Sequence, residues 1–206
     1  MSAAERGRAE RYRFEEDRQR YIAGRATLRR ILMERTGIKP DQFVIEEAEW
    51  KKPRLVATPG APCVYFNVSH SGDYAIIACS NSAEVGVDIE QIRAGCPVDD
   101  LARRYYAAVE HEGLRKLPHS RRLLHFYRLW TIKEAALKCA GLGLSVPPNV
   151  LQVALRANGI PSMTCLDAAH KSLAGFFVRE LALADGYVAA VAVEAESAEI
   201  EILNAK

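Results

Sequence analysis

The sequence lacks the paired cysteines that mark zinc sites and disulfide-rich secreted domains. Its five cysteines are odd in number and scattered, and no two of them form a C-x-x-C pair. This pattern argues against a zinc centre and a disulfide scaffold, and it favours a reducing compartment. We therefore expect a cytoplasmic protein.

Long apolar runs and an excess of one charge are also missing. No apolar stretch reaches the roughly 18 residues that a membrane helix needs, so the sequence predicts no membrane span and no signal peptide. The net charge is +2, from 28 basic and 26 acidic side chains, which does not point to nucleic acid. Residues 1–35 hold ten arginines, but they come without aromatic platforms or a known motif, so RNA binding ranks last among the alternatives.

Glycine-rich nucleotide motifs are absent as well. The sequence has no G-x-x-x-x-G-K-[ST] loop, and Gly141-Leu142-Gly143 lacks the third glycine and the preceding strand of a dinucleotide fingerprint. We therefore expect neither triphosphate hydrolysis on a P-loop nor hydride transfer on a Rossmann unit.

What the sequence does contain is a helix followed by strands, twice over. The predicted helices cover 12–34, 99–117 and 121–140, and the predicted strands cover 43–45, 55–56, 64–68, 74–79, 85–89, 151–155, 176–180, 187–193 and 200–203. Strands 74–79 and 85–89 are expected to form a hairpin.

A weak internal similarity accompanies this repeated order. Residues 72–90 align with 185–203, and residues 21–38 align with 127–144. Chance similarity between two hairpins and two helices is the alternative. We interpret the pattern as a pseudo-duplicated α+β protein, with halves at 1–96 and 97–206, in which each half packs a helix on a small antiparallel sheet. A ligand cleft is expected between the halves.

The stretch VGVDIE, residues 85–90, places two acids on one face of a predicted strand. Side chains alternate along a strand, so Asp88 and Glu90 point the same way, about 6.5 to 7 Å apart. Carboxylate oxygens without nearby His or Cys suit Mg²⁺. The alternative is an exposed strand face on which the acids are simply solvated.

A second group of charges lies in WTIKEAALK, residues 130–138. On a helix Trp130, Glu134 and Lys138 are spaced four apart and share one face. They could form a surface ion pair, or a partly buried acid and base that serve as a metal ligand or general base and as a phosphate clamp.

A third candidate is FNVSHSGDY, residues 66–74. Ser69, His70 and Ser71 end a predicted strand at a turn, where hydroxyls, backbone N–H groups and an imidazole could surround an anion. Capping of the turn by serine beside an exposed histidine is the alternative. No G-x-S-x-G motif surrounds either serine, so neither is expected to be a nucleophile.

In order and spacing, these pieces resemble the phosphopantetheinyl transferases of the surfactin-synthetase-activating type. That family shows a V/I-G-V/I-D-x-E strand followed by W-T/S-x-K-E-A-x-x-K, and here Trp130 follows Asp88 by 42 residues. FNVSHSG and WKKPRL resemble two further segments of the family. Lys51 stands where the family has glycine, and Ile132 stands where a basic residue is common.

The resemblance implies a function and a fold. The family transfers the 4′-phosphopantetheine arm of coenzyme A to a serine of an acyl or peptidyl carrier protein, releasing adenosine 3′,5′-bisphosphate. Its fold has two similar α+β halves with coenzyme A in the cleft between them, which agrees with the internal similarity. We expect a monomer, because one chain already supplies both sides of the cleft.

Joined with the charges above, the resemblance assigns roles to individual residues. The proposed Mg²⁺ ligands are Asp88, Glu90 and Glu134. The proposed coenzyme A contacts are Arg25, Lys52, Ser69, His70 and Lys138. Glu134 is the candidate general base, directly or through water, and Lys138 the candidate electrophile on the phosphates.

Two rival functions use the same residues. One is a Mg²⁺-dependent phosphohydrolase acting on coenzyme A or a related pyrophosphate, with water as nucleophile. The other is a catalytically silent binder of coenzyme A or carrier protein. The silent binder has no evident need for all of Asp88, Glu90, Glu134 and Lys138.

Overall fold

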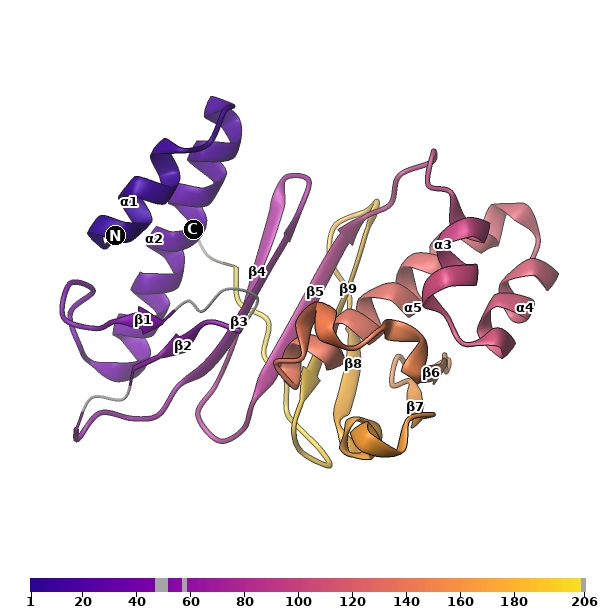
Figure 1. Ribbon diagram of the computed structural model, residues 1–206. Helices are drawn as coiled ribbons and strands as arrows, with labels where there is room; N and C mark the ends of the chain where they lie inside the picture. Colours follow the sequence, from indigo (N-terminus) through magenta and orange to yellow (C-terminus); the bar gives the residue numbers. More distant parts are fainter. Residues whose placement is uncertain (47–51, 57–58, 205–206) are drawn as a thin grey trace.

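The longer strands lie in the middle of the molecule, with helices at both ends (Figure 1). The computed structural model describes residues 1–46, 52–56 and 59–204. The N-terminal elements are α1 (Ala3–Glu10), α2 (Glu15–Thr36), β1 (Ile45–Glu46), β2 (Arg54–Leu55), β3 (Tyr65–Ser71), β4 (Tyr74–Ser80) and β5 (Val85–Gln91). The C-terminal elements are α3 (Val98–Tyr105), α4 (Ala108–Lys116), α5 (His119–Cys139), η1 (Gly143–Ser145), η2 (Pro148–Val150), β6 (Leu151–Ala154), β7 (Ser162–Cys165), η3 (Ala168–Gly175), β8 (Phe177–Leu181) and β9 (Tyr187–Val193).

The first long helix, α2, packs on the hairpin of β3 and β4. Leu28 and Leu32 lie on one face of α2 and are fully buried against a core that includes Phe66. Burial of each such leucine contributes about 1.5 to 3 kcal/mol relative to exposure. The helix ends at Gly37, whose φ of 73° suits glycine and whose N–H donates to the Met33 carbonyl at 2.8 Å.

The second long helix, α5, packs on the sheet formed by β5, β9 and β8. Its buried alanine Ala135 belongs to the same core as Ala190 and Ala192 of β9. Each end of the molecule thus combines a long helix with antiparallel strands, and the predicted α+β class with small antiparallel sheets is confirmed. The boundary at residues 96 and 97 stays a prediction.

The predicted helix over 99–117 is wrong as a single element, because the chain breaks it into α3 and α4. Tyr106 adopts an extended conformation, with φ −111° and ψ 153°. Its ring is buried and its hydroxyl donates to the Phe126 carbonyl at 2.6 Å. The Glu110 carboxylate then accepts the Ala107 N–H at 2.8 Å and so caps α4. Burial of one tyrosine ring thus overrides local helix propensity.

The predicted hairpin of strands 74–79 and 85–89 is also wrong. The hairpin joins β3 to β4, with Ser71 opposite Tyr74 and a two-residue turn that includes Gly72 at φ 56°. Strand β5 instead pairs antiparallel with β9 along its whole length, from Val85 opposite Val193 to Gln91 opposite Tyr187. The two halves of the chain therefore share one sheet, β5-β9-β8.

The segment after β9 returns toward the N-terminal helices (Figure 1). Ala195, Ala198 and Ile200 pack against the valines of β5 and β9. The predicted strand 200–203 does not form, because this segment packs through side chains only, and Ile202 and Leu203 remain exposed. Among the described residues, no helix combines the length and apolar character needed to cross a membrane.

Candidate functional site

The site begins where the backbone of α5 crosses β5 at close range. A Cβ placed on Gly86 would lie 2.1 Å from the Ala135 carbonyl oxygen and 2.3 Å from the Cys139 nitrogen. Both atoms belong to backbone that cannot swing aside, so only glycine fits here. This explains the glycine in VGVDIE, and the close approach brings Glu134 and Lys138 of α5 toward the acids of β5.

Asp88 lies at the centre of this crossing. Its side chain is 5% exposed, so the solvated strand face considered from the sequence does not apply. The Lys138 amine donates to Asp88 Oδ1 at 2.6 Å, and the Ser69 hydroxyl donates to the same oxygen at 2.9 Å. Lys138 also donates to Ser69 Oγ at 3.1 Å. Three residues predicted from three separate motifs therefore meet.

The three carboxylates are under-neutralised. Burial raises the pKa of Asp88 above its ordinary value, against the lowering effect of the Lys138 charge and hydrogen bond. Burial likewise raises the pKa of Glu90 and of Glu134, and the negative charge of Asp88 raises both further. Lys138 is the cation that offsets all three. The charge of Arg93 also lowers the pKa of Glu90, so two cations face three acids and the site keeps a capacity for positive charge.

The oxygen atoms of these acids have the chemistry that a divalent cation needs. Asp88 Oδ2 is buried and, within the described parts of the chain, has no hydrogen-bond partner. In the same described residues the Glu134 carboxylate has no hydrogen bond either. Free, hard oxygen atoms are the ligands that Mg²⁺ prefers, so the donor set fits. The side chains are not gathered for coordination, since no group of three or more His, Cys, Asp or Glu among the described residues is placed to hold a metal.

Strand β3 sends its two predicted phosphate contacts in opposite directions. Ser69 is buried and faces Asp88, whereas His70 is exposed. Alternation along the strand places His70 on the face opposite Ser69, the face from which Val68 contacts the α2 core. The structure does not bring His70 together with the carboxylates, and its role stays a prediction.

Arg25 is engaged by a carboxylate from α1. Its guanidinium lies 2.7 Å from Glu5 Oε1, and the Arg29 Nε donates to Glu5 Oε2 at 2.7 Å. Burial would raise the pKa of Glu5, but hydrogen bonds from Arg29 and from the Ser2 N–H, with the charge of Arg25, outweigh it and lower this pKa to about 2. The predicted contact of Arg25 to phosphate stays a prediction.

Lys52, which precedes β2, joins this part of the chain to the start of β5 and to the end of α5. Its amine donates to Glu84 Oε2 at 2.5 Å, to the Val85 carbonyl at 2.6 Å and to the Cys139 carbonyl at 3.2 Å. It lines a cavity of about 300 Å³ with residues from both sides of the predicted boundary, including His170. The carboxylates of β5 do not line this cavity. Lys51, a predicted departure from the family, lies outside the described residues.

Sequence reasoning missed two residues that hold β5 in place. Asn67 Oδ1 accepts the Val87 N–H at 2.9 Å, and Ser71 Oγ accepts the Gln91 N–H at 3.0 Å. Ser71 was considered only as a hydroxyl at the turn. A polar residue at every second position of an otherwise buried strand was the signal that could have found both.

Models of two families match this chain. Residues 84–192 match the 4′-phosphopantetheinyl transferase superfamily. Residues 1–82 match the N-terminal part of a 4′-phosphopantetheinyl transferase family. The first match covers more than half of the chain and includes the crossing of β5 and α5.

Individual proteins are also similar to the chain. The 4′-phosphopantetheinyl transferase HetI of Nostoc sp. is 37% identical over 145 residues, which are 70% of this chain and 61% of that protein. A 4′-phosphopantetheinyl transferase of Bacillus subtilis is 31% identical over 167 residues, 81% of this chain and 72% of that protein. The chain thus spans about three fifths of the length of HetI.

A solved structure shows a more distant similarity. It is a holo-(acyl-carrier-protein) synthase from Bacillus anthracis in complex with CoA (3′,5′-ADP), with 20% identity and a TM-score of 0.43. The match covers 54% of this chain and 94% of that one. On the family match and the sequence relatives, the chain belongs to the 4′-phosphopantetheinyl transferase superfamily.

Proposed function

We propose that this protein transfers the 4′-phosphopantetheine arm of coenzyme A to a serine hydroxyl of an acyl or peptidyl carrier protein. The carrier serine oxygen attacks the phosphorus that bears the pantetheine arm. The P–O bond to the nucleotide breaks, and adenosine 3′,5′-bisphosphate leaves with the electron pair. The single observation that carries this proposal is the convergence of Asp88, Ser69 and Lys138, drawn from three motifs of the family.

The residues divide the work by position and charge. The Lys138 side chain is 28% exposed and its amine donates two hydrogen bonds, so the third N–H of its ammonium can bind a phosphate oxygen. Glu134 has a pKa raised first by burial, which makes its carboxylate a stronger base for the proton of the carrier serine. We further propose Arg25, Lys52, Ser69 and His70 as contacts to the nucleotide end, which would position the phosphorus.

Asp88, Glu90 and Glu134 are the proposed ligands of Mg²⁺. Supporting this are the unpartnered buried Asp88 Oδ2 and the excess negative charge at the crossing. Bound there, Mg²⁺ would hold the pyrophosphate and offset the charge that develops on the leaving oxygen.

The direct test is to incubate the protein with coenzyme A, Mg²⁺ and a panel of apo carrier proteins, and to follow intact mass. We expect at least one carrier to gain the phosphopantetheine arm. Asp88→Asn should lower this rate by about 100-fold or more, because it removes a charged ligand of the proposed Mg²⁺ site. Asp41→Asn, at an exposed loop aspartate, is the matched control and should leave the rate unchanged.

Two outcomes would contradict the proposal. Cleavage of coenzyme A without mass gain on any carrier would favour the phosphohydrolase. A parent-like rate in Asp88→Asn would remove Asp88 from the site.

A further inference from the structure

Strands β3 and β5 are joined by side chains. From Asn67 onward, every second residue of β3 accepts a hydrogen bond from every second backbone N–H of β5, at 2.9, 3.3 and 3.0 Å. The acceptors are Asn67, Ser69 and Ser71, and the donors are Val87, Ile89 and Gln91 respectively. Residue numbers rise together on both sides, so the two strands run in the same direction. We call this set of contacts the side-chain junction.

The two serines of the junction have a second contact that the asparagine lacks. Each serine oxygen accepts an N–H, so its own proton is left to donate elsewhere. Ser69 donates to Asp88 Oδ1 and Ser71 donates to Glu90 Oε2, both at 2.9 Å. Among the residues described, the Asn67 side chain bonds only to the Val87 N–H. The junction therefore sets the register of β5 and also restrains two carboxylates.

Asp88 and Glu90 depend on their serines to different degrees. Asp88 Oδ1 has a second donor, the Lys138 amine at 2.6 Å. Glu90 has no second donor in the described structure, and Ser71 is its one hydrogen-bond partner. A glutamate side chain has several rotatable bonds, and fixing them costs conformational entropy. The Ser71 hydroxyl is the contact that selects one arrangement of Glu90.

We propose that Ser71 is a positioning residue for Glu90. The inference rests on the proposed function, in which Glu90 contributes an oxygen to the cation that holds the pyrophosphate. Ser71 fixes the carboxylate through its O–H and the backbone of β5 through its oxygen. Asn67 fixes only the backbone of β5, so a variant at Asn67 is a control for a variant at Ser71.

The experiment compares Ser71→Ala, Ser71→Thr and Asn67→Ala. The first readout is amide hydrogen exchange by NMR at Gln91 and Val87, and the second is Mn²⁺ binding measured by EPR without coenzyme A or carrier. Ser71→Ala should speed exchange at Gln91 and weaken Mn²⁺ binding by about tenfold, the usual size for loss of a group that orients a ligand. Ser71→Thr keeps the hydroxyl and should restore both.

The control variant should separate the two contacts. Asn67→Ala should speed exchange at Val87 while leaving Mn²⁺ binding at the parent value. Ser71→Cys, similar in size but a weak donor, should shift Mn²⁺ binding in the same direction as Ser71→Ala and serves if the alanine variant fails to fold.

Three results have distinct meanings. Equal weakening of Mn²⁺ binding in Ser71→Ala and Asn67→Ala would show a purely structural role and overturn the inference. Parent-like Mn²⁺ binding in Ser71→Ala would overturn it too. A parent protein that binds Mn²⁺ but modifies no carrier would instead defeat the proposed function, and the contrast between the variants would still decide the role of Ser71.

Discussion

Two lysines of α5 sit in opposite electrostatic surroundings. Lys133 is fully buried, and its amine donates to Glu110 Oε2 at 2.7 Å, to the Pro148 carbonyl at 3.1 Å and to the Leu151 carbonyl. An ammonium has three N–H donors, so none is left over. Lys138, on the same helix, is the cation shared by the under-neutralised carboxylates of β5 and α5.

Glu110, the partner of Lys133, and Asp88, the partner of Lys138, also differ in how fully their oxygens are hydrogen-bonded. Glu110 uses both oxygens, accepting the Val153 N–H at 2.7 Å with one and the Ala107 N–H with the other. Asp88 leaves a buried oxygen without a partner among the described residues. Fully paired buried charges hold a fold together, whereas a buried excess of one charge marks a place for a ligand. The comparison therefore separates Lys133, which is fully paired within the fold, from Lys138, whose role in the site stays a prediction.

The largest expected effect on stability comes from breaking the buried ion pair of Lys133 with Glu110. Lys133→Met leaves the Glu110 carboxylate buried and unpaired, which should cost about 3 to 5 kcal/mol in free energy of unfolding. Urea denaturation measures this directly. Lys116→Met, at an exposed lysine on α4, is the control and should change stability by no more than about 0.5 kcal/mol. A loss below 1 kcal/mol in Lys133→Met would end the distinction between the two lysines.

The next effect is at the paired Glu5 and depends on pH. Its pKa is lowered in the folded protein from 4.5 to about 2, so its charge stabilises the fold above pH 4.5 and this contribution is lost as pH falls toward 2. Glu5→Gln should cost about 3 kcal/mol at pH 7 and progressively less in that acid range. Thermal unfolding at pH 7 and pH 3 gives the comparison.

A matched control lies on the same helix. Glu10→Gln changes an exposed acid of α1 and should leave the stability of the fold unchanged at both pH values. If Glu5→Gln loses as much stability at pH 3 as at pH 7, the effect comes from packing, and Glu5 does not act through its charge.

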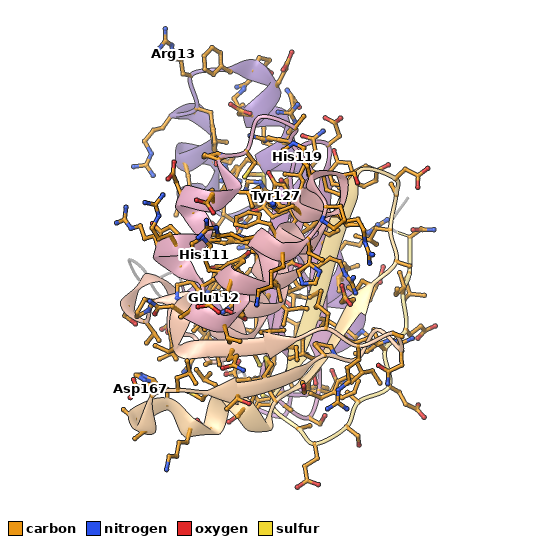
Figure 2. The ribbon with its side chains drawn as sticks, turned by 90° about the vertical axis from the view of Figure 1, so that its right-hand side faces the viewer. Arg13, His111, Glu112, His119, Tyr127 and Asp167 are labelled. Atoms are coloured by element: carbon orange, nitrogen blue, oxygen red, sulfur yellow. The ribbon has the colours of Figure 1, made fainter. Side chains whose placement is uncertain are left out.

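The smallest expected effect on the free energy of unfolding has the opposite sign. Glu134→Gln removes one of three crowded negative charges, so it should raise the free energy of unfolding by about 1 kcal/mol in metal-free protein at pH 8, while abolishing transfer. Glu112→Gln, at an exposed position on α4 (Figure 2), is the control and should change neither quantity. A destabilised Glu134→Gln would mean that the carboxylate is better paired than its surroundings indicate.

The sequence predicted the two long helices and most of the strands, and it placed several charged side chains relative to their near neighbours. Apolar periodicity located α2, α5 and strands β3 to β5 to within a few residues, because each has a strong local pattern. The i,i+4 spacing placed Glu134 and Lys138 on one face, and alternation paired Asp88 with Glu90. These are short-range rules that read directly from the order of residues.

Long-range contacts could not be predicted in this way. Strand β5 pairs with β9 about a hundred residues further on, and nothing local to either strand specifies the partner. The ion pair of Lys138 with Asp88 also depends on tertiary approach, which the sequence hinted at only through Gly86. Arg25 was assigned to phosphate from the family resemblance, and its partner Glu5 lies on a short helix that the pattern did not reveal.

The position of β5 between two different neighbours has a mechanical consequence. On one side a ladder of seven residue pairs binds it to β9, and on the other three side chains bind it to β3. If a force pulls the two ends of the molecule apart, the three side-chain hydrogen bonds between β3 and β5 should break before the ladder between β5 and β9. Asp88 and Glu90 would then travel with α5 and Lys138, and the loss of their serine partners would be the first chemical change that the site undergoes.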